Sequence, residues 1–170
     1  MATSIELATP AVFAGALPDL ARLLHAVVHD GASVGFVVPF DRAAAQAFWA
    51  DRVLPELRAG SAVCWLARAG ARPVGSVQLA SAAMPNQPHR GDVRKLLVHP
   101  EMRRQGVARA LMATLEASAR ASGLRLLTLD TRTGDPGQSL YRRLGYAEAG
   151  TIPGYCLDPF DASKVDATTV

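Results

Sequence analysis

Cysteine, lysine and aromatic residues are scarce in this chain of 170 residues. Its two cysteines, Cys64 and Cys156, lie far apart and lack the close spacing of a metal-binding pair. A single disulfide between these two cysteines is one alternative, but a reduced cytoplasmic protein is the simpler interpretation. Long apolar runs are missing as well, since none approaches the roughly 18 residues that a membrane span needs. The N-terminus also lacks the basic segment and apolar core that mark an export signal. We therefore expect no metal, no membrane partner and no export signal.

The excess of positive charge is small, because 18 lysines and arginines stand against 15 aspartates and glutamates, for a formal net charge of +3. So small and dispersed an excess does not indicate a nucleic-acid partner. Its expected use is local, in attracting an anionic nucleotide. The length suits one domain with a sizeable core. We expect residues 1–160 to form a single domain and the polar tail 161–170 to fray.

Hydrophobic periodicity predicts an α/β (α+β) fold, in which a mixed sheet is covered by helices. Helices are expected over 17–29, 41–59 and 105–121. Asp41 is the N-cap candidate of the second helix, and Pro55 is expected to kink or end that helix in its second half. Short apolar runs predict strands at 4–8, 61–67, 73–79, 93–98, 124–129, up to about 152 and around 155–157.

The most informative segment is Arg103–Ala108, which lies between an expected strand and an expected helix. A strand that enters a helix through a glycine-containing turn directs unpaired backbone N–H groups, and the positive end of the helix dipole, at one point. Such a point binds anions, and a pyrophosphate is a natural ligand. Gly106 lets a phosphate approach the backbone, and arginines add positive charge around it. Taken alone, the turn is equally consistent with an ordinary βα connection and an arginine-rich helix surface. The arginines are Arg103, Arg104 and Arg109.

A second block lies downstream, where an apolar run ends in Asp130-Thr131 and is followed by the helical segment Gln138–Tyr146. Together the two blocks resemble the GNAT superfamily of N-acetyltransferases, over about residues 60–157. The acetyl-CoA signature of that superfamily, Arg/Gln-x-x-Gly-x-Gly/Ala, is matched by Arg103, Gly106 and Ala108. Its Leu-Tyr-x-x-x-Gly-Phe/Tyr helix is matched by Leu140, Tyr141, Gly145 and Tyr146.

A closer resemblance is to the tabtoxin-resistance branch, whose members acetylate an amino-acid-like antibiotic. The segments that carry it are Lys95–Pro100, Leu129–Gly134 and Ile152–Tyr155. The chain departs from the broad superfamily at Gly134, where many members have an asparagine that contacts the pantetheine arm. Thr131 or Ser139 is the expected substitute.

The resemblance implies a GNAT-like mixed, mostly antiparallel sheet of six to seven strands, with helices on both faces and a splay between the two central parallel strands. Acetyl-CoA is the implied co-substrate, with its pantetheine arm in that splay, and no metal is implied. The implied cofactor-binding residues are Leu96, Leu97, Val98, Arg103, Arg104, Gln105, Gly106, Val107, Ala108, Arg109, Thr131, Ser139 and Tyr141. The backbone N–H groups around Leu97 are expected to polarise the thioester carbonyl.

Acetyl transfer to an amine, by direct attack in a ternary complex, needs a base for the nitrogen and a proton for the departing thiolate. Asp92 and Asp130 are the candidate bases, because each stands at an end of one of the two splayed strands; a surface charge and a turn residue are the alternative interpretations. Tyr141 is the candidate acid, and the resemblance places the matching tyrosine beside the cofactor sulfur. Its alternative role is a core aromatic.

The resemblance implies that the loop from Asp30 to Phe40 covers the acceptor. The candidate acceptor-binding residues are His29, Asp30, Phe36, Trp49 and Tyr155. His25 and His29 have metal-compatible spacing, but no third ligand follows. We expect a primary amine of a small molecule as acceptor, with an amine of a protein and a non-catalytic acyl-CoA sensor as alternatives. The resemblance also allows a homodimer through the final strands.

Overall fold

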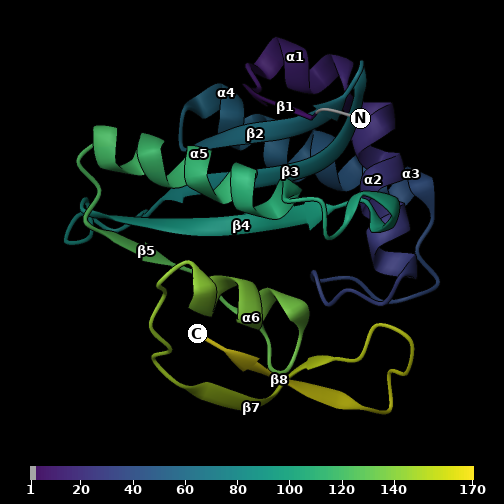
Figure 1. Ribbon diagram of the computed structural model, residues 1–170. Helices are drawn as coiled ribbons and strands as arrows, with labels where there is room; N and C mark the ends of the chain where they lie inside the picture. The colour runs from purple at the N-terminus through teal and green to yellow at the C-terminus, as the bar shows by residue number, and fades with distance from the viewer. Residues whose placement is uncertain (1–2) are drawn as a thin grey trace.

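The computed structural model describes residues 3–170, which form two β-sheets and the helices around them (Figure 1). Five strands form the larger sheet, in the order β1-β2-β3-β4-β5. These strands are β1 (Ser4–Leu7), β2 (Ala62–Ala69), β3 (Arg72–Ser81), β4 (Arg90–Val98) and β5 (Leu126–Thr128). All neighbours are antiparallel except β4 and β5, which run parallel. The predicted mixed, mostly antiparallel sheet is confirmed.

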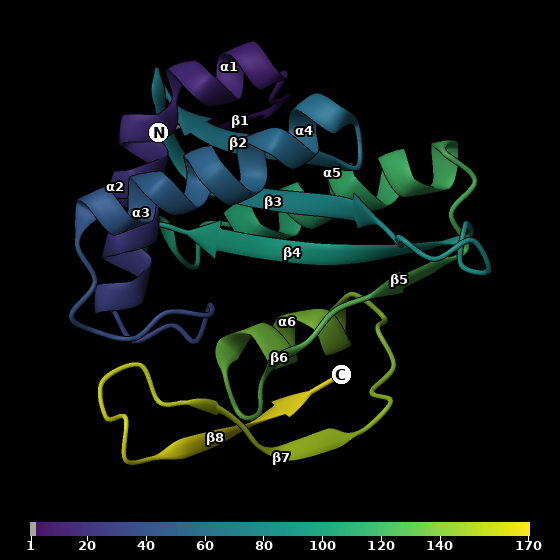
Figure 2. The same ribbon diagram turned by 180° about the vertical axis from the view of Figure 1, so that it is seen from behind.

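Helices cover both faces of this sheet, as predicted (Figures 1 and 2). On one face lie α1 (Pro10–Gly15), α2 (Leu17–His29), α3 (Arg42–Phe48) and α4 (Leu54–Ala59). Their apolar side chains form a core with the sheet that includes Phe13, Leu24 and Trp49. On the other face, α5 (Val107–Ala121) buries Leu111, Met112 and Leu115 against β2, β3 and β4.

The helical stretch predicted over 41–59 is present but contains a wider turn. Asp41 caps α3, since its carboxylate accepts a hydrogen bond from the Ala44 N–H at 2.7 Å. A single π-helical turn, Trp49–Val53, then connects α3 to α4. Pro55 stands in the first turn of α4, directly after the π-helical turn, which is the part of a helix where proline is tolerated. The proline is therefore accommodated without ending the helical path.

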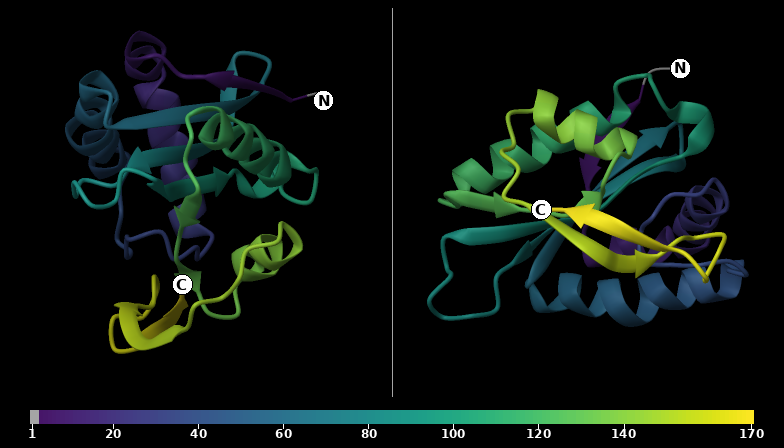
Figure 3. Two further views of the ribbon diagram at one scale, coloured as in Figure 1. Left: turned by 90° about the vertical axis from the view of Figure 1, so that its left-hand side faces the viewer. Right: turned by 90° about the horizontal axis from the view of Figure 1, so that it is seen from below.

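The smaller sheet holds the C-terminal part of the chain, in the order β6-β8-β7. Its strands are β6 (Thr131–Arg132), β7 (Thr151–Leu157) and β8 (Val165–Thr169), and α6 (Pro136–Arg143) lies between β6 and β7 in the sequence. Figure 3 shows this sheet set apart from the larger one, with the chain passing directly from β5 into β6. The eight strands exceed the predicted six to seven because β5 and β6 are separate and the tail adds β8.

The prediction that residues 161–170 fray is wrong. Strand β8 lies between β6 and β7 and pairs with both, and its Thr168 and Thr169 are buried. The polar composition of the tail misled the prediction, because threonine suits a strand and its hydroxyl finds partners inside the protein. The Thr168 hydroxyl lies 3.0 Å from both the backbone oxygen of Thr131 and Oδ2 of Asp130, and its single proton is shared between these two acceptors.

Candidate functional site

The two parallel strands separate after a short paired stretch. Pairing between β4 and β5 covers only Arg90–Asp92 and Leu126–Thr128. Beyond it, β5 gives way to β6, which pairs with β8 of the other sheet. Within residues 3–170, the side of β4 that faces away from β3 therefore has no strand partner over residues 93–98. An extended ligand with amide groups could pair with this edge as an added strand does.

A β-bulge distorts β4 within this open stretch. Arg94 is opposite Gln78 and Leu97 is opposite Ser76, so two residues, Lys95 and Leu96, face the single residue between. Lys95 adopts a positive φ of 49°, a region that residues other than glycine rarely occupy. The Ser76 hydroxyl donates to the Lys95 backbone oxygen at 3.0 Å and holds the bulge. The bulge redirects the Lys95 side chain.

A cavity of about 690 Å³ lies between the separated strands. Its walls come from β4, from the β5–β6 segment, from residues 33–35, from α6 and from the smaller sheet. We call it the cleft. Three candidate catalytic residues, Asp92, Asp130 and Tyr141, line it together, as do Leu96, Thr131 and Tyr155. Residues from distant parts of the sequence therefore meet where the sheet divides.

The two cleft carboxylates differ in their partners. Oδ1 of Asp92 accepts a hydrogen bond from Arg90 at 2.6 Å and another from the Thr128 hydroxyl. Asp130 has no ion pair within residues 3–170; its Oδ2 accepts a hydrogen bond from the Thr168 hydroxyl at 3.0 Å. The charge of Asp92 is thus already neutralised by an arginine, whereas that of Asp130 is not.

Tyr141 is carried by α6, whose first helical residue is Pro136. Its ring makes an edge-on contact with Tyr146 at 5.7 Å between centroids. Burial, and secondly the negative charge of Asp130, raise the pKa of Tyr141 to about 12. The phenol therefore stays protonated throughout the neutral range and is available as a hydrogen-bond donor.

The turn after β4 presents backbone donors to solvent. Gly106 is the N-cap of α5 with φ of 83°, and the first helical hydrogen bond runs from the Ala110 N–H to its oxygen at 3.0 Å. The three preceding N–H groups in the helix have no intrahelical acceptor. No heavy atom lies within 4 Å of the position that a Cβ on Gly106 would take. The turn is an open, positively polarised cradle of the kind that binds phosphates.

The sequence model of the acetyltransferase (GNAT) family matches residues 26–146, which is most of the chain. The chain belongs to this family. It is 34% identical over 121 residues to an uncharacterized N-acetyltransferase of Azospirillum brasilense, and the match covers 69% of each chain. The protein is therefore an acetyltransferase of the GNAT type.

Solved structures of low sequence identity share the GNAT fold. An N-acetyltransferase from Staphylococcus aureus Mu50 superposes with a TM-score of 0.78 at 16% identity, over 99% of this chain and 97% of that one. The Salmonella typhimurium protein yncA, solved with its cofactor acetyl-CoA, superposes with a TM-score of 0.74 at 16% identity, over 99% and 91%.

Several cofactor-binding candidates of the GNAT protein have other partners in the structure. Arg103 forms an ion pair with Asp30, so its charge is engaged by the end of α2. The Gln105 amide donates to the Glu101 oxygen at 3.0 Å and braces the turn. Leu97 is buried, and both Leu97 and Ser139 lie outside the cleft lining. Exposed or partly exposed candidates in and around the turn are Val98, Arg104, Ala108 and Arg109, while Val107 is buried.

Four of the five acceptor-binding candidates do not line the cleft. The assignment of Trp49 is wrong, because its ring is fully buried in the core and its Nε1 donates to the Leu20 oxygen at 2.9 Å. Asp30 pairs with Arg103, and His29 Nε2 lies 2.8 Å from the Phe40 oxygen. Phe36 packs among aromatic rings next to the cleft. Tyr155 lines the cleft and is 54% exposed.

Lys95 is the cleft residue that the sequence analysis missed. Its Nζ donates to the Val34 oxygen at 2.6 Å and stands over the rings of Phe36 and Phe48, at 5.3 Å and 5.1 Å from their centroids. Burial lowers the pKa of this amine, while the charge of Asp130 acts in the opposite direction. The available signal was one of only two lysines in the chain, directly before the apolar residues Leu96–Val98.

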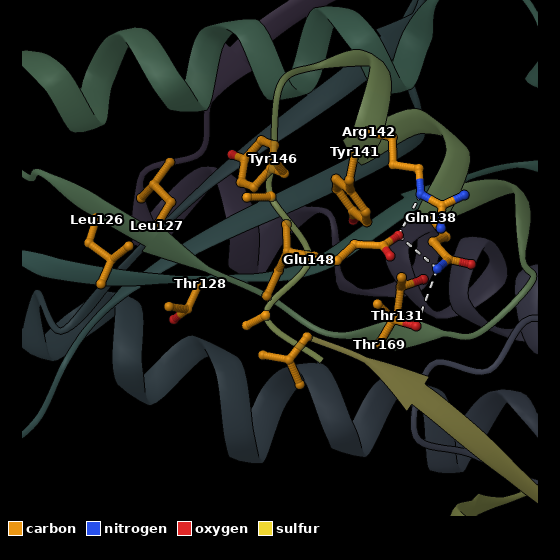
Figure 4. A pocket seen from close by; sticks show the side chains of 14 residues that line it. Leu126, Leu127, Thr128, Thr131, Gln138, Tyr141, Arg142, Tyr146, Glu148 and Thr169 are labelled. Carbon is orange, nitrogen blue, oxygen red and sulfur yellow. Dashed lines mark hydrogen bonds and ion pairs between the residues drawn. The ribbon is translucent and has the colours of Figure 1, made fainter. Parts of the chain in front are cut away.

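A second, smaller cavity of about 150 Å³ lies beside β5 and α6 (Figure 4). Leucines of β5 and the rings of Tyr141 and Tyr146 form its apolar part. At its polar end, Glu148 accepts hydrogen bonds from Arg142 at 2.5 Å and from Gln138 at 2.9 Å, and Gln138 also contacts Thr169 (Figure 4). These contacts fasten α6, and with it Tyr141, to the smaller sheet.

Within residues 3–170, no three or more histidine, cysteine, aspartate or glutamate side chains are grouped as metal ligands. Nor does any helix in that range have the length and apolar character needed to cross a membrane.

Proposed function

We propose that this GNAT protein transfers the acetyl group of acetyl-CoA to the primary amine of a small molecule, by direct attack in a ternary complex. The observation that carries the proposal is the convergence of Asp130 and Tyr141 on one cleft, beside the open edge of β4. The cleft volume of about 690 Å³ lies within the roughly 300–1,000 Å³ typical of small-molecule sites.

The residues present fit acetyl-CoA on three structural grounds. The cradle at Gly106 has room where a Cβ would stand and offers free backbone donors for a pyrophosphate. The unpaired edge of residues 93–98 offers N–H and C=O groups to the amides of a pantetheine arm. Tyr141 lines the cleft that this edge borders. Acetyl-CoA supplies the activated acyl group, as a thioester.

Asp130 is the better base of the two cleft carboxylates. An alkylammonium titrates near 10.4, so a base must remove its proton before the nitrogen can attack. The Arg90 and Thr128 donors already occupy Oδ1 of Asp92, whereas Asp130 holds one hydroxyl donor. Asp130 accepts the proton of the ammonium group, the neutral nitrogen forms a C–N bond with the carbonyl carbon, and the C–S bond breaks. Tyr141 donates its hydrogen bond to the departing sulfur, which takes up a proton as the amide nitrogen loses one.

An amino-acid-like acceptor is proposed over a protein amine. The cleft is flanked by residues 33–35 on one side and by Tyr155 and Cys156 of β7 on the other, which suits a compact molecule. The similarity of three sequence segments to the tabtoxin-resistance branch points the same way. A protein or peptide amine, with the cleft opening into a groove, is the competing proposal.

The test is the mass-spectrometric detection of acetylated product from acetyl-CoA and a panel of small amines, with a lysine-containing peptide in parallel. Small amines should be acetylated faster than the peptide. Asp130→Asn should lower kcat by about 100-fold or more, the usual contribution of a general base. The matched variant Asp92→Asn should lower kcat less, because Asp92 is held by Arg90. A reversed order of the two variants, or binding without any product, would contradict the proposal.

A further inference from the structure

The charged side chains around the cleft are paired, except for Lys95 and Asp130. The arginines each meet a carboxylate, Arg90 with Asp92 at 2.6 Å, Arg94 with Glu56 at 3.2 Å and Arg132 with Asp135 at 2.9 Å. Lys95 also lines the cleft, but no carboxylate of residues 3–170 forms an ion pair with it. A largely buried cation without a counter-ion is costly unless something else compensates its charge.

The protein supplies Lys95 with partial compensation. An ammonium group has three N–H donors, and here one reaches the Val34 oxygen at 2.6 Å. The faces of Phe36 and Phe48 carry partial negative charge and hold Nζ at 5.3 Å and 5.1 Å. These contacts fix the position of the ammonium group without neutralising it. It therefore keeps the capacity to bind an anion that enters the cleft.

The backbone of β4 is distorted at this lysine. Lys95 sits in the bulge with a positive φ of 49°, which is strained for a residue with a side chain. Strained backbone that carries a polar side chain into a cavity is typical of functional sites.

We propose that Lys95 binds the carboxylate of the acceptor, and that the acceptor is therefore an amino acid or a close analogue rather than a simple amine. The proposal rests on the proposed acetyl transfer and names its substrate class. Asp130 lines the same cleft, and its charge acts on both Lys95 and Tyr141, so it is the candidate to receive the amino group of the same molecule. A cation and an anion on neighbouring walls of one cleft match the two ends of a zwitterion.

The chain offers an unusually direct test, because Lys95 and Lys164 are its two lysines. Isotope labelling of lysine side chains should give two NMR signals, and Lys164, which pairs with Asp161 at 3.0 Å on the surface, is the internal control. The probes are L-phenylalanine with 2-phenylethylamine, and L-lysine with 1,5-diaminopentane, each pair differing by one carboxyl group. The amino acids should shift the Lys95 signal and leave that of Lys164 unchanged, and the decarboxylated amines should shift neither.

Acetylation kinetics give the second readout. Lys95→Met should raise KM for the amino acid by about tenfold or more, the usual effect of losing a hydrogen bond to a charged group, and leave KM for the matching amine nearly unchanged. Lys95→Arg should restore most of the preference, and Lys164→Met should behave as the native protein. Equal losses for both members of a pair, or no shift of the Lys95 signal by any amino acid, would overturn the proposal. The NMR titration needs no turnover, so it separates failure at Lys95 from failure of acetyl transfer.

Discussion

Replacing Tyr141 by phenylalanine removes one hydroxyl group from the cleft and leaves the ring that packs against Tyr146. The pKa of the Tyr141 phenol is raised to about 12, whereas a thiol titrates near 8.5. Complete transfer of the phenol proton to a free thiolate would then be uphill by about 3.5 pKa units, or about 5 kcal/mol. Tyr141 is therefore expected to act chiefly through a hydrogen bond to the sulfur as charge develops there.

The size of the effect follows from that role. A hydrogen bond to a charged group contributes about 1.5–3 kcal/mol, so Tyr141→Phe should lower kcat by about 10- to 100-fold. Affinity for acetyl-CoA should change little, because the interaction strengthens only as the C–S bond breaks. Since the raised pKa keeps the phenol protonated, the native enzyme should show no loss of kcat from Tyr141 ionisation below about pH 10.

The assay is the pH dependence of kcat for native protein and Tyr141→Phe with one acetylated amine, together with calorimetric acetyl-CoA affinity for both. Two results would refute the reasoning. One is a Tyr141→Phe variant with native kcat. The other is an alkaline decline of native kcat between about pH 8 and 9.5 that disappears in the variant, which would mean that the phenol titrates well below 12.

Three further predictions concern stability and support of the cleft. Trp49→Phe should lower the free energy of unfolding, measured in urea, by about 1–3 kcal/mol, because Trp49 is a core residue whose Nε1 donates to the Leu20 oxygen. The KM for the acceptor should not change. A raised KM would mean that Trp49 does contribute to the acceptor site. Thr168→Val should lower kcat several-fold, because it removes the hydroxyl that donates to Asp130, whereas Thr168→Ser keeps the hydroxyl and should keep kcat. Equal kcat values in the two variants would argue against a role of this hydrogen bond in the reaction. Burial raises the pKa of Tyr141 from 10.0 to about 12 and that of the Cys64 thiol from 9.0 to about 12. The folded protein holds these protons after the unfolded chain releases them, so stability should be complete below about pH 9 and fall as the pH rises towards 12. Urea unfolding midpoints that stay constant over this range would contradict that expectation.

The sequence predicted the parts of the fold that local pattern controls. Helical spacing in α2 and α5 and the apolar runs of β2, β3 and β4 follow from burying one face of an element, which is a local property. The division of the sheet after Asp92 follows the family resemblance and is confirmed. Strand β8 was missed because its pattern is polar, and its pairing with β6 and β7 joins segments that are distant in the sequence.

Residue types were easier to predict than their partners. Asp92, Asp130 and Tyr141 were predicted as catalytic residues, and the structure brings them to one cleft. The pairing of Arg90 with Asp92 was missed because the strand was predicted to begin at residue 93; β4 begins at Arg90, and residues two apart in a strand lie on one face. Trp49 was misassigned because an aromatic residue in a pocket wall and one in a core have the same local pattern. Lys95 was missed because a bulge that turns one side chain has no marker in a single sequence.

Calorimetric titration of acetyl-CoA into native protein, Gly106→Trp and Gly70→Trp tests the proposed cofactor cradle most directly. Gly70 is the matched control, because it also has a positive φ, of 61°, and no heavy atom within 4 Å of an added Cβ, but lies in the β2–β3 turn. Native protein and Gly70→Trp should bind acetyl-CoA alike, and Gly106→Trp should lose binding while remaining folded. Native affinity in Gly106→Trp, or no binding by folded native protein, would contradict the site and the activity proposed for it.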